Sequence, residues 1–272
     1  MLGNRAVLVS SISTVVFFAL IAIVVMLSPG SKEVANDFFS WDAMWEAFFG
    51  TPTTPAIWRS FLLNIRMFLI AEVLILVLAL VIAVIRQMPG PVFFPLRLLA
   101  VVYTDLFRGM PLLLVIYIFG FGIPGLELKG ISNQSPVVLG VAALVLSYSA
   151  YVAEVYRAGI QSVHTSQVAA ARSLGLSRWQ AMRFVVLPQA VRRVVPPLLN
   201  DFISLQKDTA LVAVLGPIEA ARAAAIYGAD RFNYSSFVVA AFLFVLLTIP
   251  LARFTDHLVE RDRRRRESGG AP

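Results

Sequence analysis

The sequence predicts an all-α integral membrane protein with about six transmembrane helices. Of its 272 residues, 58% are hydrophobic and 14% are charged, whereas a soluble domain carries roughly a quarter charged residues. The hydrophobic residues form runs of about the length that a helix needs to cross a bilayer. Arginines cluster between these runs and at the C-terminal end, as expected for cytoplasmic segments. Topology therefore accounts for the net charge of +7, and we expect no nucleic-acid partner.

The first candidate span is followed by an aromatic segment. Residues 6–27 form an uninterrupted apolar run that a Ser-Pro-Gly turn ends. A signal peptide is the alternative, but the run is long and no clear A-x-A cleavage site follows it. Residues 31–57 mix acidic and aromatic side chains, a composition that favours the lipid headgroup level. We expect residues 1–57 to form a retained span and an interfacial segment, ahead of a main transmembrane domain at 58–253.

The other spans are apolar runs closed by turns or basic residues. They are expected at residues 60–85, 95–121, 136–156, 196–215 and 235–251. External loops are expected at 123–135 and 219–233, and a basic, disordered cytoplasmic tail at 254–272. Near the cytoplasmic end of the fourth span, Glu154 shares a helical face with Arg157, and it is a candidate pathway residue. Six spans place both termini on one side, which the arginines mark as the cytoplasm.

The third span is interrupted by the sequence TDLFRGMP. Asp105 and Arg108 are three residues apart, so they share a helical face and could neutralise each other. Gly109 and Pro111 weaken the helix, and irregular backbone in a membrane is tolerated only inside protein or beside a water-filled cavity. These four residues therefore mark either a substrate pathway or a kink that an internal ion pair stabilises.

The fifth span carries a polar stripe. At 100° per residue, four polar side chains fall on one face: Asn200, Ser204, Lys207 and Asp208. Such a stripe on an apolar helix should face the bundle interior or a pathway. An ion pair between Lys207 and Asp208 that serves only stability is the alternative, although it is a costly device in a membrane. We expect the stripe to line a substrate pathway, with Lys207 facing a carboxylate and Asp208 an ammonium group.

Residues 160–195 form a charged loop between the fourth and fifth spans. Residues 166–174 are rich in alanine and predict a short helix, which Gly175 ends. Ser177 can cap a second helix, which should end at Leu187-Pro188 because proline disfavours a helical residue before it. Two short helices with a glycine hinge predict a docking element on the basic side of the membrane. An amphipathic hairpin lying on the headgroups is the alternative.

Four ordered motifs in this chain resemble a known family. They are FRGMPLLL at 107–114, SAYVAEVYRAGIQSV at 149–163, AAARSLGLSRWQAMRFVVLPQAVRRVVPPLLN at 169–200, and LQKDTALVAVLG at 205–216. The chain resembles the membrane subunits of bacterial ABC importers, and within these it is most similar to the polar amino acid permeases of the histidine, glutamine and glutamate type. The third motif corresponds to the family's EAA loop. The resemblance extends over residues 58–253.

The resemblance implies a type I ABC importer permease fold with a cytoplasmic coupling-helix loop. It assigns contact with an ATPase to these loop residues: Ala169, Ala170, Ala171, Arg172, Gly175, Arg178, Leu187 and Pro188. The family's acidic EAA residue is replaced here by Ala169, so we expect helix packing and the nearby arginines to carry more of this contact.

The resemblance implies a complex in the bacterial cytoplasmic (inner) membrane. The partners of this chain in that complex are a pair of ATPase subunits, a second permease subunit that is identical or related, and an external substrate-binding protein. The expected substrate is glutamate, glutamine, aspartate or a basic amino acid. The chain lacks the phosphate-binding pattern GxxxxGK[ST], so ATP and magnesium are expected on the partner ATPase. We expect no cofactor, catalytic residue or metal site in this chain.

Two other classes of function compete with an ABC importer subunit. An ion-coupled secondary transporter or channel would also use the polar stripe, but no inverted repeat is evident and neither class explains the charged loop. A membrane-embedded enzyme would need a nucleophile–base pair or a metal-ligand cluster, and the sequence contains neither pattern. Co-purification with an ATPase separates the first class from the other two.

Overall fold

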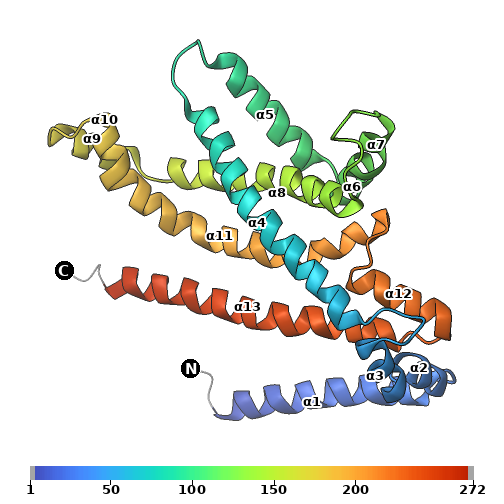
Figure 1. Ribbon diagram of the computed structural model, residues 1–272. Coiled ribbons are helices and arrows are strands. Elements are labelled where there is room, and N and C mark those ends of the chain that lie inside the picture. Colours follow the sequence, from blue (N-terminus) through green and yellow to red (C-terminus); the bar gives the residue numbers. More distant parts are fainter. Residues whose placement is uncertain (1–3, 269–272) are drawn as a thin grey trace.

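Every regular element that the computed structural model describes, over residues 4–268, is a helix (Figure 1). Residues 1–3 and 269–272 lie outside the described part. The elements in chain order are α1 (Asn4–Leu27), α2 (Ser31–Phe38), α3 (Trp41–Phe49), α4 (Ile57–Gln87), α5 (Phe94–Gly109), α6 (Leu112–Tyr117), the π-helix η1 (Ile118–Gly122), α7 (Ile123–Gly125), α8 (Pro136–Gln161), α9 (Thr165–Ser173), α10 (Arg178–Ala181), the π-helix η2 (Met182–Val186), α11 (Leu187–Asp208), the 3-10 helix η3 (Thr209–Leu215), α12 (Ala220–Arg231) and α13 (Ser235–Ser268). The predicted all-α class is confirmed.

Four of the described helices, α1, α4, α8 and α13, are long and apolar enough to cross a membrane unaided. Two bent helix pairs raise this to six spans if each pair counts as one: α5 with α6–α7, and α10–η3 with α12. In the first pair the axes differ by 109°, so the interruption expected at TDLFRGMP is confirmed as a sharp break at Met110-Pro111. The predicted six spans are therefore reached only if each of the two bent pairs counts as one span.

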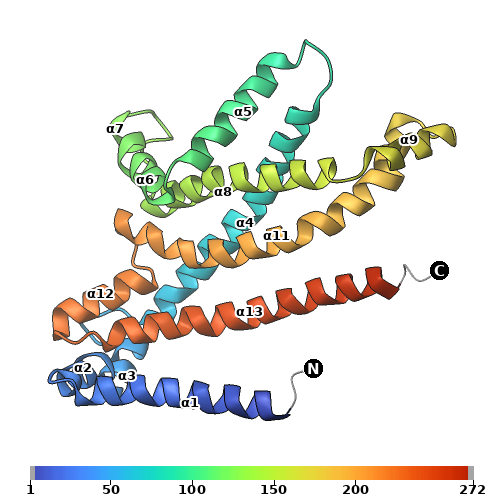
Figure 2. The ribbon, with the colours of Figure 1, turned by 180° about the vertical axis from the view of Figure 1, so that it is seen from behind.

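The helix ends sort to two sides of the molecule. The N-terminal end of α1, the C-terminal end of α13 and the α9–α10 loop lie together in both Figure 1 and Figure 2. The short helices α2, α3, α7 and α12 lie at the opposite end. This arrangement agrees with the sequence-based topology, in which both termini and the charged loop share one side of the membrane.

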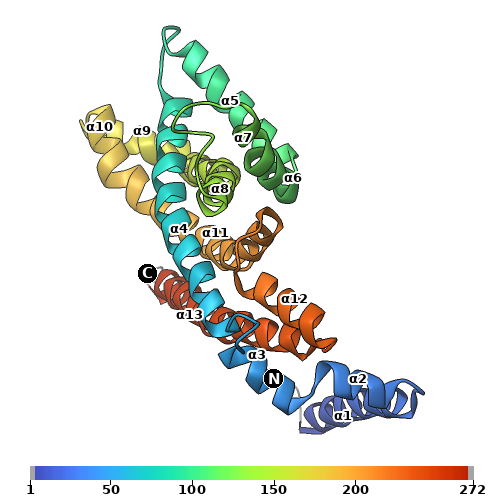
Figure 3. The ribbon, with the colours of Figure 1, turned by 45° about the vertical axis from the view of Figure 1, so that its right-hand side comes forward.

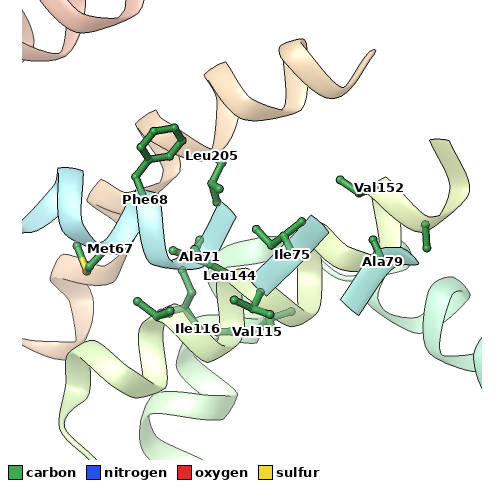
Figure 4. Close-up of a cluster of buried hydrophobic side chains, with 14 of the residues drawn as sticks. Met67, Phe68, Ala71, Ile75, Ala79, Val115, Ile116, Leu144, Val152 and Leu205 are labelled. Carbon is green, nitrogen blue, oxygen red and sulfur yellow. The ribbon is translucent and has the colours of Figure 1, made fainter. Parts of the chain in front are cut away.

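The core forms where α4 crosses α8 and α11 (Figure 3). Met67, Ala71 and Ile75 of α4 pack against Leu144 of α8 and Leu205 of α11, all of them buried (Figure 4). Small residues allow close approach, as is usual between membrane helices. At Gly140 of α8, an added Cβ would lie 2.4 Å from a Val212 methyl carbon. The close packing of α8 against η3 therefore requires glycine there.

A second cluster joins α3, α4, α12 and α13 at the end opposite the charged loop. Its polar centre is the fully buried Glu219, which accepts hydrogen bonds from the Ala221 and Arg222 backbone N–H groups and from Asn64 Nδ2 at 3.0 Å. Asn64 Nδ2 also donates to Thr209 Oγ1 at 3.1 Å. These bonds tie α4 to η3 and to the start of α12.

The prediction of a loop at 219–233 is wrong about conformation, because residues 220–231 form helix α12. Six alanines favour a helix there, and Glu219 caps its first turn. The disordered tail expected at 254–272 is also wrong for its described part, since α13 continues through Ser268. Residues 252–268 contain neither glycine nor proline and are rich in arginine and glutamate, which are strong helix formers.

Candidate functional site

The charged loop is built as a helix–glycine–helix unit, as predicted. Gly175 ends α9 with a φ of +85°, and its Cβ position faces open space. A side chain there would be strained by backbone conformation alone, because L-residues rarely adopt positive φ. Ser177 begins α10 with a reciprocal capping box: its hydroxyl accepts from the Gln180 N–H at 3.2 Å, and its own N–H donates to Gln180 Oε1 at 2.8 Å.

The second helix does not end at Leu187-Pro188, so that part of the prediction is wrong. The chain passes from α10 through the π-turn η2 into α11, and Pro188 lies in the first turn of α11. Proline lacks only an N–H that a first turn leaves unpaired, and the widened π-turn accommodates its ring. The fifth span accordingly starts before residue 196, and Pro196 and Pro197 lie inside α11. Helix α10 and the fifth span are thus one continuous helical rod, whereas α9 is separated from it by the turn at Gly175.

Apolar and polar contacts fix the loop to the ends of α8 and α11. Val163, Val186 and Ala190 form a small buried cluster. The Arg193 guanidinium donates to the Ser162 carbonyl, and the Gln189 amide donates to the Gln167 side chain. These contacts hold the loop against the C-terminal end of α8 and the N-terminal part of α11.

The outer surface of the loop presents large apolar side chains. Leu174, Trp179 and Phe184 are 82%, 70% and 63% exposed. Beside them, Ala169, Ala170, Arg172 and Arg178 are exposed, whereas Ala171, which also belongs to α9, is buried. Exposed apolar groups rimmed by charge are typical of protein-interaction surfaces. Ala169 lies on the surface, so a carboxylate at this position would change the exposed face of the loop rather than its packing.

A polar pocket of 250 Å³ lies where the α5–α6 break faces α8 and α11. Its described lining is Phe107, Met110, Leu112, Ser147, Tyr148, Tyr151, Asp201, Ser204 and Asp208. The broken span therefore faces Ser204 and Asp208, two of the four residues of the polar stripe on the fifth span. Met110 and Leu112 reach the pocket because the helix is interrupted between them.

The pocket is acidic and contains an unused donor. Tyr148 Oη donates to Asp208 Oδ2 at 2.6 Å. The Ser147 hydroxyl is buried and has no hydrogen-bond partner among the described residues. Glu72 on α4 adds a third carboxylate within electrostatic range of Asp201. Among the described lining residues there is no lysine or arginine, so the site is suited to a ligand that carries a cation.

The polar stripe is rotated relative to the prediction. Ser204 and Asp208 line the pocket, but Asn200 and Lys207 are exposed and do not. Within the described chain no ion pair joins Lys207 to Asp208. Asp201 takes the place that Asn200 was expected to fill. At 100° per residue, Asp201, Ser204 and Asp208 fall within about 60° of one another around a helix. The sequence alone could therefore have indicated this narrower polar face.

The residues around the break are placed differently from expectation. Asp105 and Arg108 form no ion pair with each other in the described chain, and both are exposed. Instead, the Arg108 guanidinium carbon lies 5.9 Å from the centroid of the Tyr151 ring, and Tyr151 Oη donates to the Arg108 carbonyl at 3.1 Å. Arg108 is therefore a cation at the rim of the pocket. Gly109 and Pro111 shape the break without lining the pocket.

Glu154 belongs to an ion-pair cluster and does not line the pocket. Its carboxylate accepts from Arg86 Nη1 of α4 at 2.8 Å and from the Arg157 guanidinium one turn later on α8. Arg86 also donates to Thr104 Oγ1 of α5 at 3.1 Å. The cluster thus joins α4, α5 and α8 just before the charged loop.

Replacing Glu154 by glutamine is expected to destabilise the fold by about 3 kcal/mol, because two poorly exposed guanidinium groups lose their shared partner. Thermal unfolding in detergent measures the effect. Arg231→Gln is the matched control, since it removes the exposed Asp230–Arg231 pair, which should contribute less than about 1 kcal/mol. Equal losses in the two variants would show that the Glu154 cluster is not a structural clamp.

Sequence reasoning missed the α8 side of the pocket. Tyr151 lies in the motif SAYVAEVYRAGIQSV, and Ser147 and Tyr148 come directly before it. Only Glu154 of this region was predicted to be a pathway residue. Ser147, Tyr148 and Tyr151 fall on one helical face at spacings of one, three and four. That spacing was the available signal, because two tyrosines and a serine on one face of an apolar span predict a polar lining.

Six bent or straight spans, a polar pocket at a helix break and an exposed two-helix loop at one end define a membrane transport subunit. The chain belongs to the family described as binding-protein-dependent transport system inner membrane component, whose model matches residues 90–264. This confirms the predicted ABC importer permease family and its type I fold, and it assigns the chain a role in transport.

Named relatives and a solved structure agree with this assignment. The chain is 38% identical over 193 residues to the probable glutamine ABC transporter permease protein GlnM of Bacillus subtilis, covering 68% of this chain and 83% of that protein. It is 29% identical over 228 residues to the glutamate/aspartate import permease protein GltK of Escherichia coli, covering 82% and 98%. A crystal structure of an amino acid ABC transporter with histidines matches with a TM-score of 0.69 at 30% identity, covering 75% of this chain and 93% of that one.

Proposed function

We propose that this chain forms the membrane path for a polar amino acid in an ATP-driven importer. The observation that carries the proposal is the acidic pocket between the α5–α6 break, α8 and α11. Irregular backbone at membrane depth is stable only where it is covered by protein or lines a cavity, and here it lines a cavity with two carboxylates. The relatives named above are permeases for amino acids, which supports this substrate class.

The charges of the pocket favour a particular orientation of the substrate. Asp201 and Asp208 attract the α-ammonium group of any amino acid and the side chain of a basic one. Arg108 at the rim attracts the carboxylate, a role that the sequence had suggested for Lys207. We therefore propose that basic and neutral polar amino acids pass more readily than glutamate or aspartate, because the pocket repels a second carboxylate.

We propose that the α9–α10 loop docks on a separate ATP-hydrolysing subunit. Leu174, Trp179 and Phe184 supply apolar contact, and Arg172 and Arg178 supply charge. The contacts that anchor the loop to α8 and α11 then link the ATPase to two helices that line the pocket. In this proposal ATP and magnesium bind the partner, and residues Ala169, Ala170, Ala171, Gly175, Leu187 and Pro188 shape or support the docking face.

The same proposal sets the orientation of the chain and its other partners. The end that carries α9, α10, the start of α1 and the end of α13 faces the cytoplasm of a bacterium, and the chain lies in the inner membrane. A substrate-binding protein delivers the amino acid at the opposite end. A second permease subunit, identical or related, completes the path together with two ATPase subunits.

Uptake into reconstituted vesicles tests the proposed function. The vesicles contain the permease, the ATPase and the binding protein, and a panel of labelled amino acids with unlabelled competitors is offered outside. ATP-dependent accumulation of a basic or neutral polar amino acid is expected, with weaker uptake of glutamate and aspartate. Uptake that needs an ion gradient but no ATP would show a secondary transporter and would overturn the proposal.

A further inference from the structure

The two carboxylates of the pocket are in different states. Asp208 accepts a hydrogen bond of 2.6 Å from Tyr148, whereas Asp201 has no side-chain hydrogen bond within the described chain. Both line the same cavity, and both are half-buried. Tyr148 comes from α8 and Asp208 from the end of α11, so the bond also bridges the two helices that flank the pocket.

The Tyr148 hydroxyl gives Asp208 a single donor and leaves the negative charge of the carboxylate uncompensated. A hydrogen bond is roughly twice as strong when one group is ionised as when both are neutral, and an ammonium or guanidinium group adds an opposite charge and several donors to such a bond. An ammonium or guanidinium group that enters the pocket can therefore replace the Tyr148 hydroxyl at Asp208. The hydroxyl that leaves finds a neighbour in the same cavity, where the buried Ser147 Oγ has no partner among the described residues.

We propose that Tyr148 is a substrate-displaceable cover on Asp208: its hydroxyl occupies the carboxylate while the path is empty and gives it up to the cationic group of the substrate. The inference rests on the proposed function of the pocket and adds a role for a residue outside the polar stripe. The cover lowers the affinity of the pocket for every substrate by the same factor. A path benefits from this, because a substrate that is held too tightly is released slowly.

Tyr148→Phe tests the cover, because it removes the hydroxyl and keeps the ring. The permease–ATPase complex is placed in lipid nanodiscs without binding protein, and equilibrium binding of labelled L-arginine and L-glutamine is measured. We expect both to bind about threefold to tenfold more tightly than to the wild type. In vesicles, the maximal rate of uptake should fall as release slows. If Tyr148 were only structural, its replacement would weaken binding and would not combine tighter binding with a lower maximal rate of uptake.

Tyr103→Phe is the matched control. Tyr103 Oη donates to the Leu146 carbonyl at 2.6 Å, so this variant loses an equally short bond between a ring and α8, but Tyr103 does not line the pocket. Its affinities should match the wild type. Tyr148→Met repeats the test with a flexible side chain if the phenylalanine variant assembles poorly, which thermal unfolding reveals.

A double-mutant cycle with Asp208→Asn separates the inference from the proposed function. If Tyr148 acts through the carboxylate, its replacement should have no effect in the Asp208→Asn background. Weak binding by Asp208→Asn together with unchanged or weaker binding by Tyr148→Phe would overturn the cover alone. If Asp208→Asn binds the amino acids as tightly as the wild type does, or if the wild type does not bind them, both the proposed function of the pocket and the proposed cover are contradicted.

Discussion

Replacing Gly175 by valine is expected to uncouple ATP hydrolysis from transport while the protein still inserts and assembles. The φ of +85° at this hinge costs an L-residue about 1–2 kcal/mol, and a β-branched residue more. A penalty of this size shifts an equilibrium roughly tenfold. The hinge sets the angle between α9 and α10, so the docking face is distorted. Substrate-stimulated ATPase activity in vesicles should fall about tenfold or more.

Gly90 provides a matched control for this variant. It has a φ of +91°, and its Cβ position also faces open space, but it lies in the turn between α4 and α5. Gly90→Val carries the same backbone strain outside the docking loop and should retain coupling. Gly175→Asn should retain most of it too, because asparagine tolerates positive φ. Full coupling in Gly175→Val, or equal losses at Gly90 and Gly175, would contradict the assigned role of the loop.

Asp208→Asn is expected to reduce uptake of a basic amino acid by about one to two orders of magnitude, since hydrogen bonds to charged groups contribute about 1.5–3 kcal/mol. The change keeps the shape of the side chain while removing the charge. Asp201→Asn should act in the same direction. Initial rates of ATP-dependent uptake measure the loss, and basal ATP hydrolysis shows that the complex is still assembled.

Asp105→Asn distinguishes the substrate path seen in the structure from the path predicted from the sequence alone. Both place Asp208 on the path, but only the sequence placed Asp105 there, and the structure leaves Asp105 exposed and outside the pocket lining. Uptake by Asp105→Asn should therefore equal that of the wild type. A large loss at Asp105 with none at Asp208 would move the path away from this pocket.

Local signals in the sequence predicted the helical elements well. The apolar runs gave the spans, Gly175 and Ser177 gave the loop hinge and cap, and the proline-glycine pair gave the break in the third span. These features depend on neighbours in the chain, which a sequence displays directly. The helix α12 was also visible in its six alanines, but residues 219–233 were assigned to an external loop because they contain a glycine and two arginines.

The site was predicted only in part, because it depends on contacts between distant segments. A stripe on one helix does not show which edge its neighbours cover, so Asn200 and Lys207 were included and Asp201 was left out. Glu154 pairs with Arg157 one turn away, as the sequence spacing suggested, but it also pairs with Arg86, 68 residues away in the chain, and no local pattern indicates this second pairing. Tyr148 meets Asp208 across 60 residues for the same reason. Residues that act across helices need the fold before they can be paired.

Cysteine accessibility at Ser204 tests most directly whether the pocket is the substrate path. The chain has no native cysteine, and serine to cysteine is a small change. Ser204→Cys should react with a water-soluble thiol reagent, and the best-transported amino acid of the vesicle panel should slow that reaction severalfold. Lys207→Cys, one helical turn away on the exposed side, should react at a rate that the substrate does not change. Protection at Lys207 with none at Ser204 would contradict the path described here.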